Sequence, residues 1–115
     1  MRNNNHEKLV WMHAVSVGEV VSTTTLIDQL HLKGLKVFLS TTTKTGYETA
    51  LKMGHADHIF FFPFDFPWIM HCFFKELSPS LIILLESELW PNLIWMAHRR
   101  NIPVIVLNGR ISKKS

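Results

Sequence analysis

Residues 81–86 have the sequence LIILLE, and this stretch decides the fold class. Five consecutive apolar residues precede a carboxylate, without the apolar–polar alternation of a half-exposed strand. Such a run is typical of a strand buried on both faces, as in parallel sheets that carry helices on each side. We therefore expect residues 81–86 to form the central strand of an α/β fold.

Apolar runs of similar length alternate with amphipathic stretches elsewhere in the chain. The expected strands are 9–15, 35–41, 58–64, 81–86 and 103–107, and the expected helices are 18–33, 45–53, 67–77 and 91–100. Gly34 and Gly54 stand where glycine favours the end of a helix, and Pro67 stands where proline favours a beginning. This order predicts a Rossmann-like open parallel sheet, in which ligands bind at the carboxyl ends of the strands.

The composition is that of a globular domain. The 115 residues suffice for one domain, and a hydrophobic fraction of 47% supports a packed core. The single cysteine, Cys72, excludes an internal disulfide and, because apolar residues flank it, is expected to be buried. A net charge of +3 is too small to indicate nucleic-acid binding, so no nucleic-acid partner is expected. No apolar run reaches the length of a transmembrane helix.

The two ends of the chain differ from its middle. Residues 1–8 (MRNNNHEK) are polar, lack the apolar core of a signal peptide, and are expected to form a disordered leader before one domain over 9–115. No acidic residue follows Glu88. The basic residues beyond it are Arg99, Arg100, Arg110, Lys113 and Lys114. This basic end suits anionic ligands or lipid head groups, and a solvated helix end with a frayed tail explains it equally well.

Common cofactor and metal motifs are absent from the sequence. The chain contains no GxGxxG, GxxxxGK[ST], DxD, HExxH or CxxC. We therefore expect no dinucleotide, no P-loop phosphate site, no metal and no other cofactor. Most of the 7 histidines are expected at the surface or in packing contacts. His13 stands apart because it lies in the first expected strand, close to the loop that follows.

The first candidate loop, residues 16–19, has the sequence SVGE. Ser16 and Glu19 at this spacing form a capping box, which satisfies backbone N–H groups at a helix start. Glu19 is also a carboxylate at the mouth of the sheet, where it can act as a general base, and Gly18 allows an acceptor to approach the backbone closely. The spacing alone favours the cap.

The loop after the central strand begins with two carboxylates. Alternation points Glu86 and Glu88 to the same side, and burying a carboxylate there is costly unless it is paired. A salt bridge to Arg110, at the end of the neighbouring expected strand, explains the pattern as well as a pair of active-site acids does. Asn92 closes the same loop.

Two further loops carry candidate contacts. Thr42, Thr43 and Lys44 offer hydroxyls and an amine at a helix start, which suits an anion, although threonine caps are common. Residues 60–70 (FFFPFDFPWIM) combine one charge with six aromatic side chains. They form either a buried strand and helix start or an exposed apolar patch for a lipid surface.

Together these loops resemble the amino-terminal domain of the transferases of 3-deoxy-D-manno-octulosonic acid (Kdo) in lipopolysaccharide synthesis. The matching segments, in the family's order and approximate spacing, are WMHAVSVGE (11–19), STTTKTG (40–46), PFDFP (63–67), ESELWPNL (86–93) and PVIVLNGRISKKS (103–115). Several ungapped motifs in one register make this resemblance specific. Relatives often carry proline where this chain has Lys44.

The resemblance implies the amino-terminal half of a GT-B type enzyme, in which two Rossmann-like domains face each other across a cleft. This half takes a lipid A precursor, and a carboxyl-terminal domain, expected to lie outside these 115 residues, holds CMP-Kdo. The fragment alone is therefore expected to be inactive. The resemblance also implies an inverting, metal-independent transfer at the cytoplasmic face of the bacterial inner membrane.

The resemblance assigns two catalytic residues. Glu19 is implied to be the general base, which reverses the preference for a simple cap, and Glu86 is implied to support the transition state. The candidate substrate-binding residues are Ser16, Gly18, Thr42, Thr43, Lys44, Glu88, Asn92 and Arg110. The alternatives are another GT-B glycosyltransferase, a nucleotide-sugar epimerase domain, or a non-catalytic lipid-binding module.

Overall fold

The computed structural model describes residues 8–61, 67–85 and 91–107. Within these ranges the elements are β1 (Leu9–Ala14), α1 (Val17–Leu32), β2 (Lys36–Thr41), α2 (Lys44–Met53), β3 (His58–Phe61), α3 (Pro67–Leu77), β4 (Leu81–Leu85), α4 (Pro91–Arg99) and β5 (Val104–Val106). Each expected strand and helix is therefore confirmed, with described ends that shift by a few residues; the expected strand ends at residues 64 and 86 lie outside the described residues. The glycine stops are confirmed as well, since Gly34 and Gly54 have φ angles of 81° and 65°.

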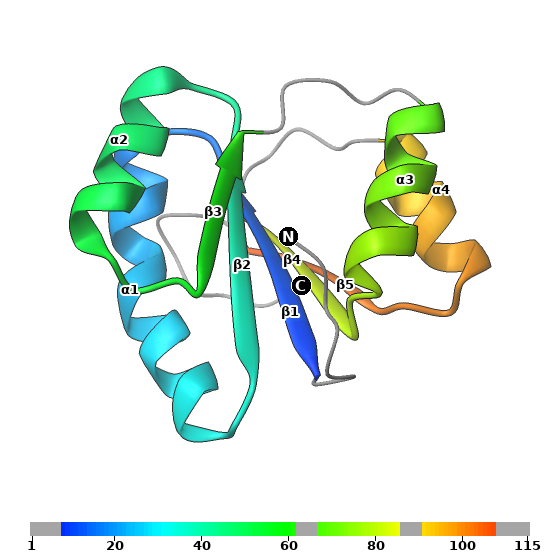
Figure 1. The fold of residues 1–115 in the computed structure, drawn as a ribbon, viewed down its shortest axis with the longest axis horizontal. Helices are drawn as coiled ribbons and strands as arrows, with labels where there is room; N and C mark the ends of the chain where they lie inside the picture. The colour runs from blue at the N-terminus through cyan, green and yellow to red at the C-terminus, as the bar shows by residue number, and fades with distance from the viewer. Residues whose placement is uncertain (1–7, 62–66, 86–90, 108–115) are drawn as a thin grey trace.

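The strands form one parallel sheet in the order β3-β2-β1-β4-β5 (Figure 1). The chain moves outward from β1 to β3, then returns across the sheet to place β4 on the other side of β1. This reversal makes the β1–β4 boundary the topological switch point, where open α/β sheets bind their ligands. The predicted Rossmann-like architecture is confirmed. The LIILL segment, β4, is an inner strand, but the central strand is its neighbour β1.

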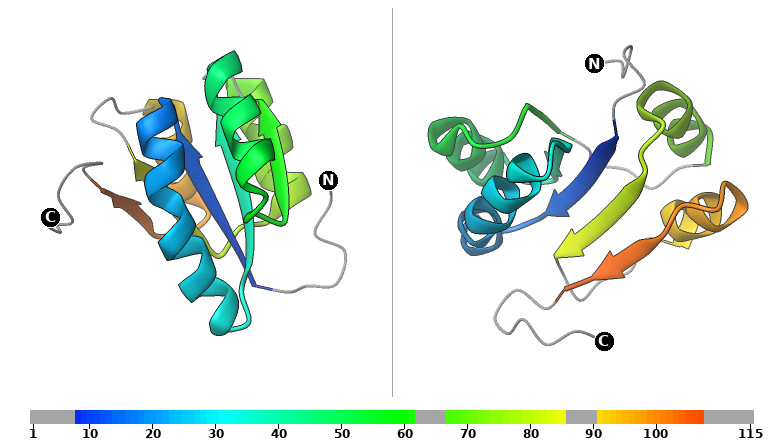
Figure 2. Two further views of the ribbon diagram at one scale, coloured as in Figure 1. Left: turned by 90° about the vertical axis from the view of Figure 1, so that its left-hand side faces the viewer. Right: turned by 90° about the horizontal axis from the view of Figure 1, so that it is seen from below.

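The helices form a layer on each face of the sheet (Figure 2). One core, between the sheet and the layer of α1 and α2, contains Met12, Leu39, Ile83 and Ile27. The other core, between the sheet and the layer of α3 and α4, contains Trp11, Phe38, Leu84 and Phe74. Successive residues of β1 therefore alternate between the two cores, which is why this strand is apolar except for His13.

The prediction that Cys72 is buried is wrong. The cysteine is exposed on α3, whereas Met70, Phe74 and Leu77 of the same helix are fully buried. These three residues follow the spacing of one helical face, and Cys72 lies two positions from both Met70 and Phe74, which turns it away from that face. Apolar neighbours in the sequence did not indicate burial here because helical periodicity decided it.

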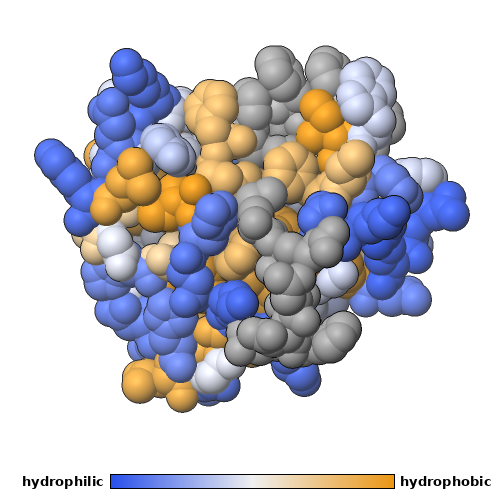
Figure 3. All heavy atoms as spheres, in the orientation of Figure 1, coloured by the Kyte–Doolittle hydropathy of each residue, from blue (hydrophilic) through white to orange (hydrophobic). Residues whose placement is uncertain are grey.

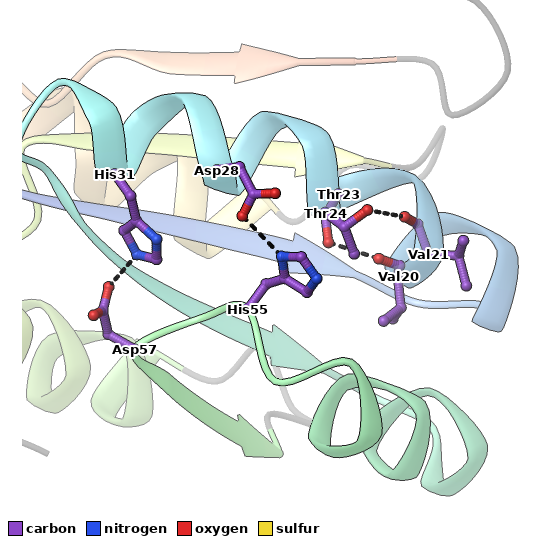
Figure 4. Close-up of polar contacts among 8 residues, drawn as sticks. All are labelled: Val20, Val21, Thr23, Thr24, Asp28, His31, His55 and Asp57. Atoms are coloured by element: carbon purple, nitrogen blue, oxygen red, sulfur yellow. Dashed lines mark hydrogen bonds and ion pairs between the residues drawn. The ribbon is translucent and has the colours of Figure 1, made fainter.

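The end of α1 is tied to the segment between α2 and β3 (Figure 4). Asp57 Oδ2 lies 2.7 Å from His31 Nε2 and also accepts a hydrogen bond of 2.7 Å from the backbone N–H of Val37. Asp28 Oδ1 lies 2.8 Å from His55 Nδ1, at a more exposed position. Both contacts lie far from the carboxyl ends of the strands, so we assign them to stability.

We expect Asp57→Ala to lower the free energy of unfolding of this chain by about 1–2 kcal/mol, because the N–H of buried Val37 loses its acceptor. The matched change Asp28→Ala removes only the more exposed contact between Asp28 and His55. It is expected to lower the free energy of unfolding by about 0.5 kcal/mol or less. Urea unfolding of both variants measures the difference. Equal costs would show that the Val37 hydrogen bond contributes nothing.

Candidate active site

The loops that carry the candidate residues start from neighbouring strands. Ala14, the last residue of β1, is in register with Leu85, the last residue of β4. Residues 15–19 follow one strand and residue 86 follows the other, at the switch point of the sheet. Glu86, Glu88 and Arg110 lie outside the described residues, so their predicted contacts stay predictions. The described candidates are Ser16, Gly18, Glu19, Thr42, Thr43, Lys44 and Asn92.

The start of α1 has the cap that the sequence favoured. Ser16 is the N-cap, and its side chain accepts a hydrogen bond of 3.2 Å from the backbone N–H of Glu19. The reciprocal bond is shifted by one residue, because Glu19 Oε1 accepts from the N–H of Val15 at 2.8 Å instead of from that of Ser16. Glu19 is half-buried, and a Cβ on Gly18 would meet no atom within 4 Å. One oxygen of the carboxylate is therefore held by a backbone N–H, and the space beside Gly18 is open.

The threonine loop contacts the same segment. The Thr43 hydroxyl donates a hydrogen bond of 2.8 Å to the carbonyl of Val15 and accepts one of 3.1 Å from the N–H of Gly46. Thr42 is half-buried, and Lys44 is exposed. Lys44 is the first residue of α2, a position that suits proline as well as lysine.

Asn92 lies on a different helix of the same edge. It is the second residue of α4 and is half-buried. The helix begins directly after the loop that follows β4. The fold therefore brings the starts of α1, α2 and α4 to the carboxyl edge of one parallel sheet, since each of these helices follows a strand in it.

A buried polar group lies beneath this edge. His13 is fully buried, and its Nδ1 lies 2.6 Å from Ser40 Oγ, which accepts a hydrogen bond of 2.8 Å from Trp11 Nε1. Burial lowers the pKa of His13 to about 4, so the ring is neutral near pH 7. The sequence singled out His13 but missed Ser40, because their pairing depends on the register between β1 and β2.

A groove of about 350 Å³ lies between α3 and α4. Its lining residues are His71, Trp95, Met96, Arg99 and Arg100. The Arg99 guanidinium lies 5.0 Å from the centre of the Trp95 ring, a cation–π contact. Trp95 is 53% exposed beside Arg99, and Trp68, in the first turn of α3, is 65% exposed. Figure 3 shows hydrophobic and strongly hydrophilic residues next to each other on the side formed by α3 and α4.

The basic end and the aromatic loop are described only in part. Arg99 and Arg100 are exposed, as expected for the basic end. Of the described aromatic residues in the expected apolar patch, Phe61 and Trp68 are exposed and Phe60 is buried. Phe64 and Phe66 lie outside the described residues. Among residues 8–61, 67–85 and 91–107 no helix is long and apolar enough to cross a membrane. The same residues contain no cluster of three or more His, Cys, Asp or Glu side chains that could hold a metal ion.

Comparison with known proteins adds sequence relatives. The family model of 3-deoxy-D-manno-octulosonic-acid transferases matches residues 1–115. The 3-deoxy-D-manno-octulosonic acid transferase of Haemophilus influenzae is 40% identical over 110 residues, which cover 92% of this chain and 26% of that protein. That of Bordetella pertussis is 34% identical over 113 residues, with the same coverages of 92% and 26%. The chain thus spans about a quarter of the length of these relatives.

A solved structure supports the fold. MurG of Acinetobacter baumannii, a GT-B glycosyltransferase, matches with a TM-score of 0.64 at 13% identity. The match covers 87% of this chain and 34% of that one. At this identity the likeness concerns the fold alone, and it agrees with the expected half of a GT-B type architecture.

Proposed function

Because the chain belongs to the 3-deoxy-D-manno-octulosonic-acid transferase family, we propose that it is the acceptor-binding half of a two-domain enzyme that transfers Kdo from CMP-Kdo to a lipid A precursor. In this proposal the donor binds to the other domain of the full-length enzyme. Family membership and the position of Glu19 at the switch point support this proposal.

In this reaction Glu19 is the general base. The acceptor sugar hydroxyl loses its proton to the Glu19 carboxylate, the resulting oxygen nucleophile attacks the anomeric carbon of Kdo, and CMP leaves from the opposite face with inversion. The N–H of Val15 holds Oε1, so Oε2 takes the proton. Glu86 supports the developing positive charge, and no metal takes part.

One observation carries this assignment. Glu19 lies one turn into α1, directly after the central strand β1, with one carboxylate oxygen fixed by a backbone N–H and the space beside Gly18 open. A general base must come within about 2.6–3.2 Å of the group whose proton it abstracts, and the carboxylate oxygen that Val15 does not hold is the one proposed to reach the incoming hydroxyl. If Glu19 were only a cap of α1, the hydrogen bond from Val15 would be needed, but the space beside Gly18 would not need to be open.

A transfer assay with the full-length enzyme tests the function. Incubation with CMP-Kdo and a tetra-acylated lipid A precursor is expected to give a product heavier by one or more Kdo units, together with free CMP. Chelation with EDTA is expected to leave the rate unchanged. Omission of either substrate is the control. Failure of transfer with active CMP-Kdo, or transfer to a different acceptor class, would favour another GT-B enzyme or an epimerase domain.

The lipid acceptor requires contact with the membrane surface, and we assign this contact to the groove between α3 and α4. Arg99 and Arg100 line the groove and provide charges for lipid phosphates, and Trp95 in the same groove is an amphipathic ring suited to the head-group region. Trp68, outside the groove in the first turn of α3, is a second exposed ring on this layer of helices. The enzyme would then work at the cytoplasmic face of the inner membrane, with this layer of helices toward the lipid.

We expect Arg99→Gln/Arg100→Gln in the full-length protein to weaken binding to vesicles rich in phosphatidylglycerol by about 10- to 30-fold, since each basic residue near such a surface contributes about 1 kcal/mol. The matched control is Lys33→Gln/Lys52→Gln, which removes two exposed charges from the opposite layer of helices. Co-sedimentation measures both variants. An equal loss in both would contradict a specific lipid-facing surface.

A further inference from the structure

Val15 connects the candidate general base to the threonine loop. It is the residue between β1 and the N-cap of α1, and both of its backbone polar groups are bound by side chains. Its N–H donates to Glu19 Oε1 at 2.8 Å, and its carbonyl accepts from the Thr43 hydroxyl at 2.8 Å. The N–H and C=O of one extended residue are thus held by a carboxylate from α1 and a hydroxyl from the start of α2.

The Thr43 hydroxyl is committed to this contact. Its proton goes to the carbonyl of Val15, and its oxygen accepts the N–H of Gly46 in the first turn of α2. The Thr43 side chain and the first turn of α2 are therefore coupled, so that a displacement of one displaces the other. Thr41 lies beside them, with its hydroxyl at a longer 3.5 Å from the same carbonyl.

Gly46 shows how closely the two segments approach. A Cβ at this position would lie 2.7 Å from the hydroxyl oxygens of both Thr41 and Thr43 and 3.0 Å from the carbonyl oxygen of Val15. Real Cβ atoms do not approach other atoms at 2.7 Å, so the first turn of α2 touches the end of β1 only because residue 46 is glycine. The close contact between α2 and Val15 therefore depends on the absence of a side chain at residue 46.

We propose that Thr43 is a positioning residue for Glu19: its hydroxyl fixes Val15, and Val15 in turn fixes the Glu19 carboxylate. This rests on the proposed function only in taking Glu19 as the general base. A shift of the Val15 backbone moves the N–H that holds Oε1, and a displacement of about 1 Å in a reacting group can cost 100-fold in rate. Thr43, a substrate-binding candidate by sequence, acts instead through the protein.

Thr43→Val in the full-length enzyme tests this role, because valine has the shape of threonine without the hydroxyl. We expect kcat to fall about 10-fold and the KM for the lipid acceptor to change less than about 2-fold, as for loss of an oriented catalytic group. Thr43→Ser restores the hydroxyl and is expected to return kcat to within about 3-fold of the wild-type value. A raised KM with normal kcat would show that Thr43 contacts the acceptor and would overturn the proposal.

Hydrogen exchange of the Val15 amide gives a second readout that does not depend on activity. Exchange is expected to be faster in Thr43→Val than in the wild type and to recover in Thr43→Ser. If the wild-type enzyme transfers no Kdo, the proposed function fails, and this measurement still tests the link from Thr43 to Val15. Unchanged exchange in Thr43→Val, or changed exchange with a normal kcat, would overturn the positioning role.

Discussion

Lowering the pH from 6.5 to 4 is expected to reduce the free energy of unfolding of this chain by roughly 3 kcal/mol through His13 alone. Burial lowers the pKa of the folded-state imidazole from 6.5 to about 4, so the unfolded chain binds a proton that the folded chain excludes throughout this interval. Stability is therefore complete above pH 6.5, falls as the pH decreases, and changes no further through this group below pH 4.

His13→Asn isolates this effect, because asparagine offers hydrogen-bonding groups to Ser40 but does not titrate. Urea unfolding between pH 7 and pH 4.5 measures the slope of stability against pH. The free energy of unfolding is expected to depend more steeply on pH in the wild type than in the variant, by an amount that corresponds to close to one bound proton. The remaining histidines contribute equally in both proteins, so their effects cancel in the difference. Parallel slopes would show that His13 is accessible to protons in the folded chain.

Much of the fold follows from local sequence. The LIILL run gave the inner strand β4, because only a strand covered on both faces is apolar throughout. Gly34, Gly54 and Pro67 marked helix ends through their backbone preferences, which do not depend on the rest of the structure. The strand order was not predictable in this way, because it depends on which strands pair across the sheet.

The site was predictable only in part. Glu19 was found from its place after β1, and the shift of its hydrogen bond from Ser16 to Val15 emerged only in three dimensions. Thr43 was assigned to a ligand because a hydroxyl at a helix start suits an anion, whereas its close partner, the Val15 carbonyl, lies 28 residues away in the chain. Contacts between different β-α loops depend on how closely the start of α2 approaches Val15, the residue after β1, which periodicity does not encode.

The account depends most on Glu19, which the structure shows as a cap and which we propose as the general base. We expect Glu19→Gln in the full-length enzyme to lower turnover roughly 100-fold or more, because an amide cannot take the acceptor proton. Glutamine keeps an oxygen for the N–H of Val15, so the cost in stability is expected to be about 1 kcal/mol or less. Glu19→Asp retains a carboxylate but withdraws it by one methylene, and it is expected to be impaired as well.

The decisive measurement is therefore the initial rate of Kdo transfer by Glu19→Gln at saturating CMP-Kdo and lipid A precursor, recorded together with the melting curve. Glu48→Gln, an exposed glutamate of α2, is the matched control and is expected to transfer at the wild-type rate. The account predicts loss of turnover in Glu19→Gln with an intact melting transition. A near-normal rate with the same melting transition would contradict it and leave Glu19 as a helix cap.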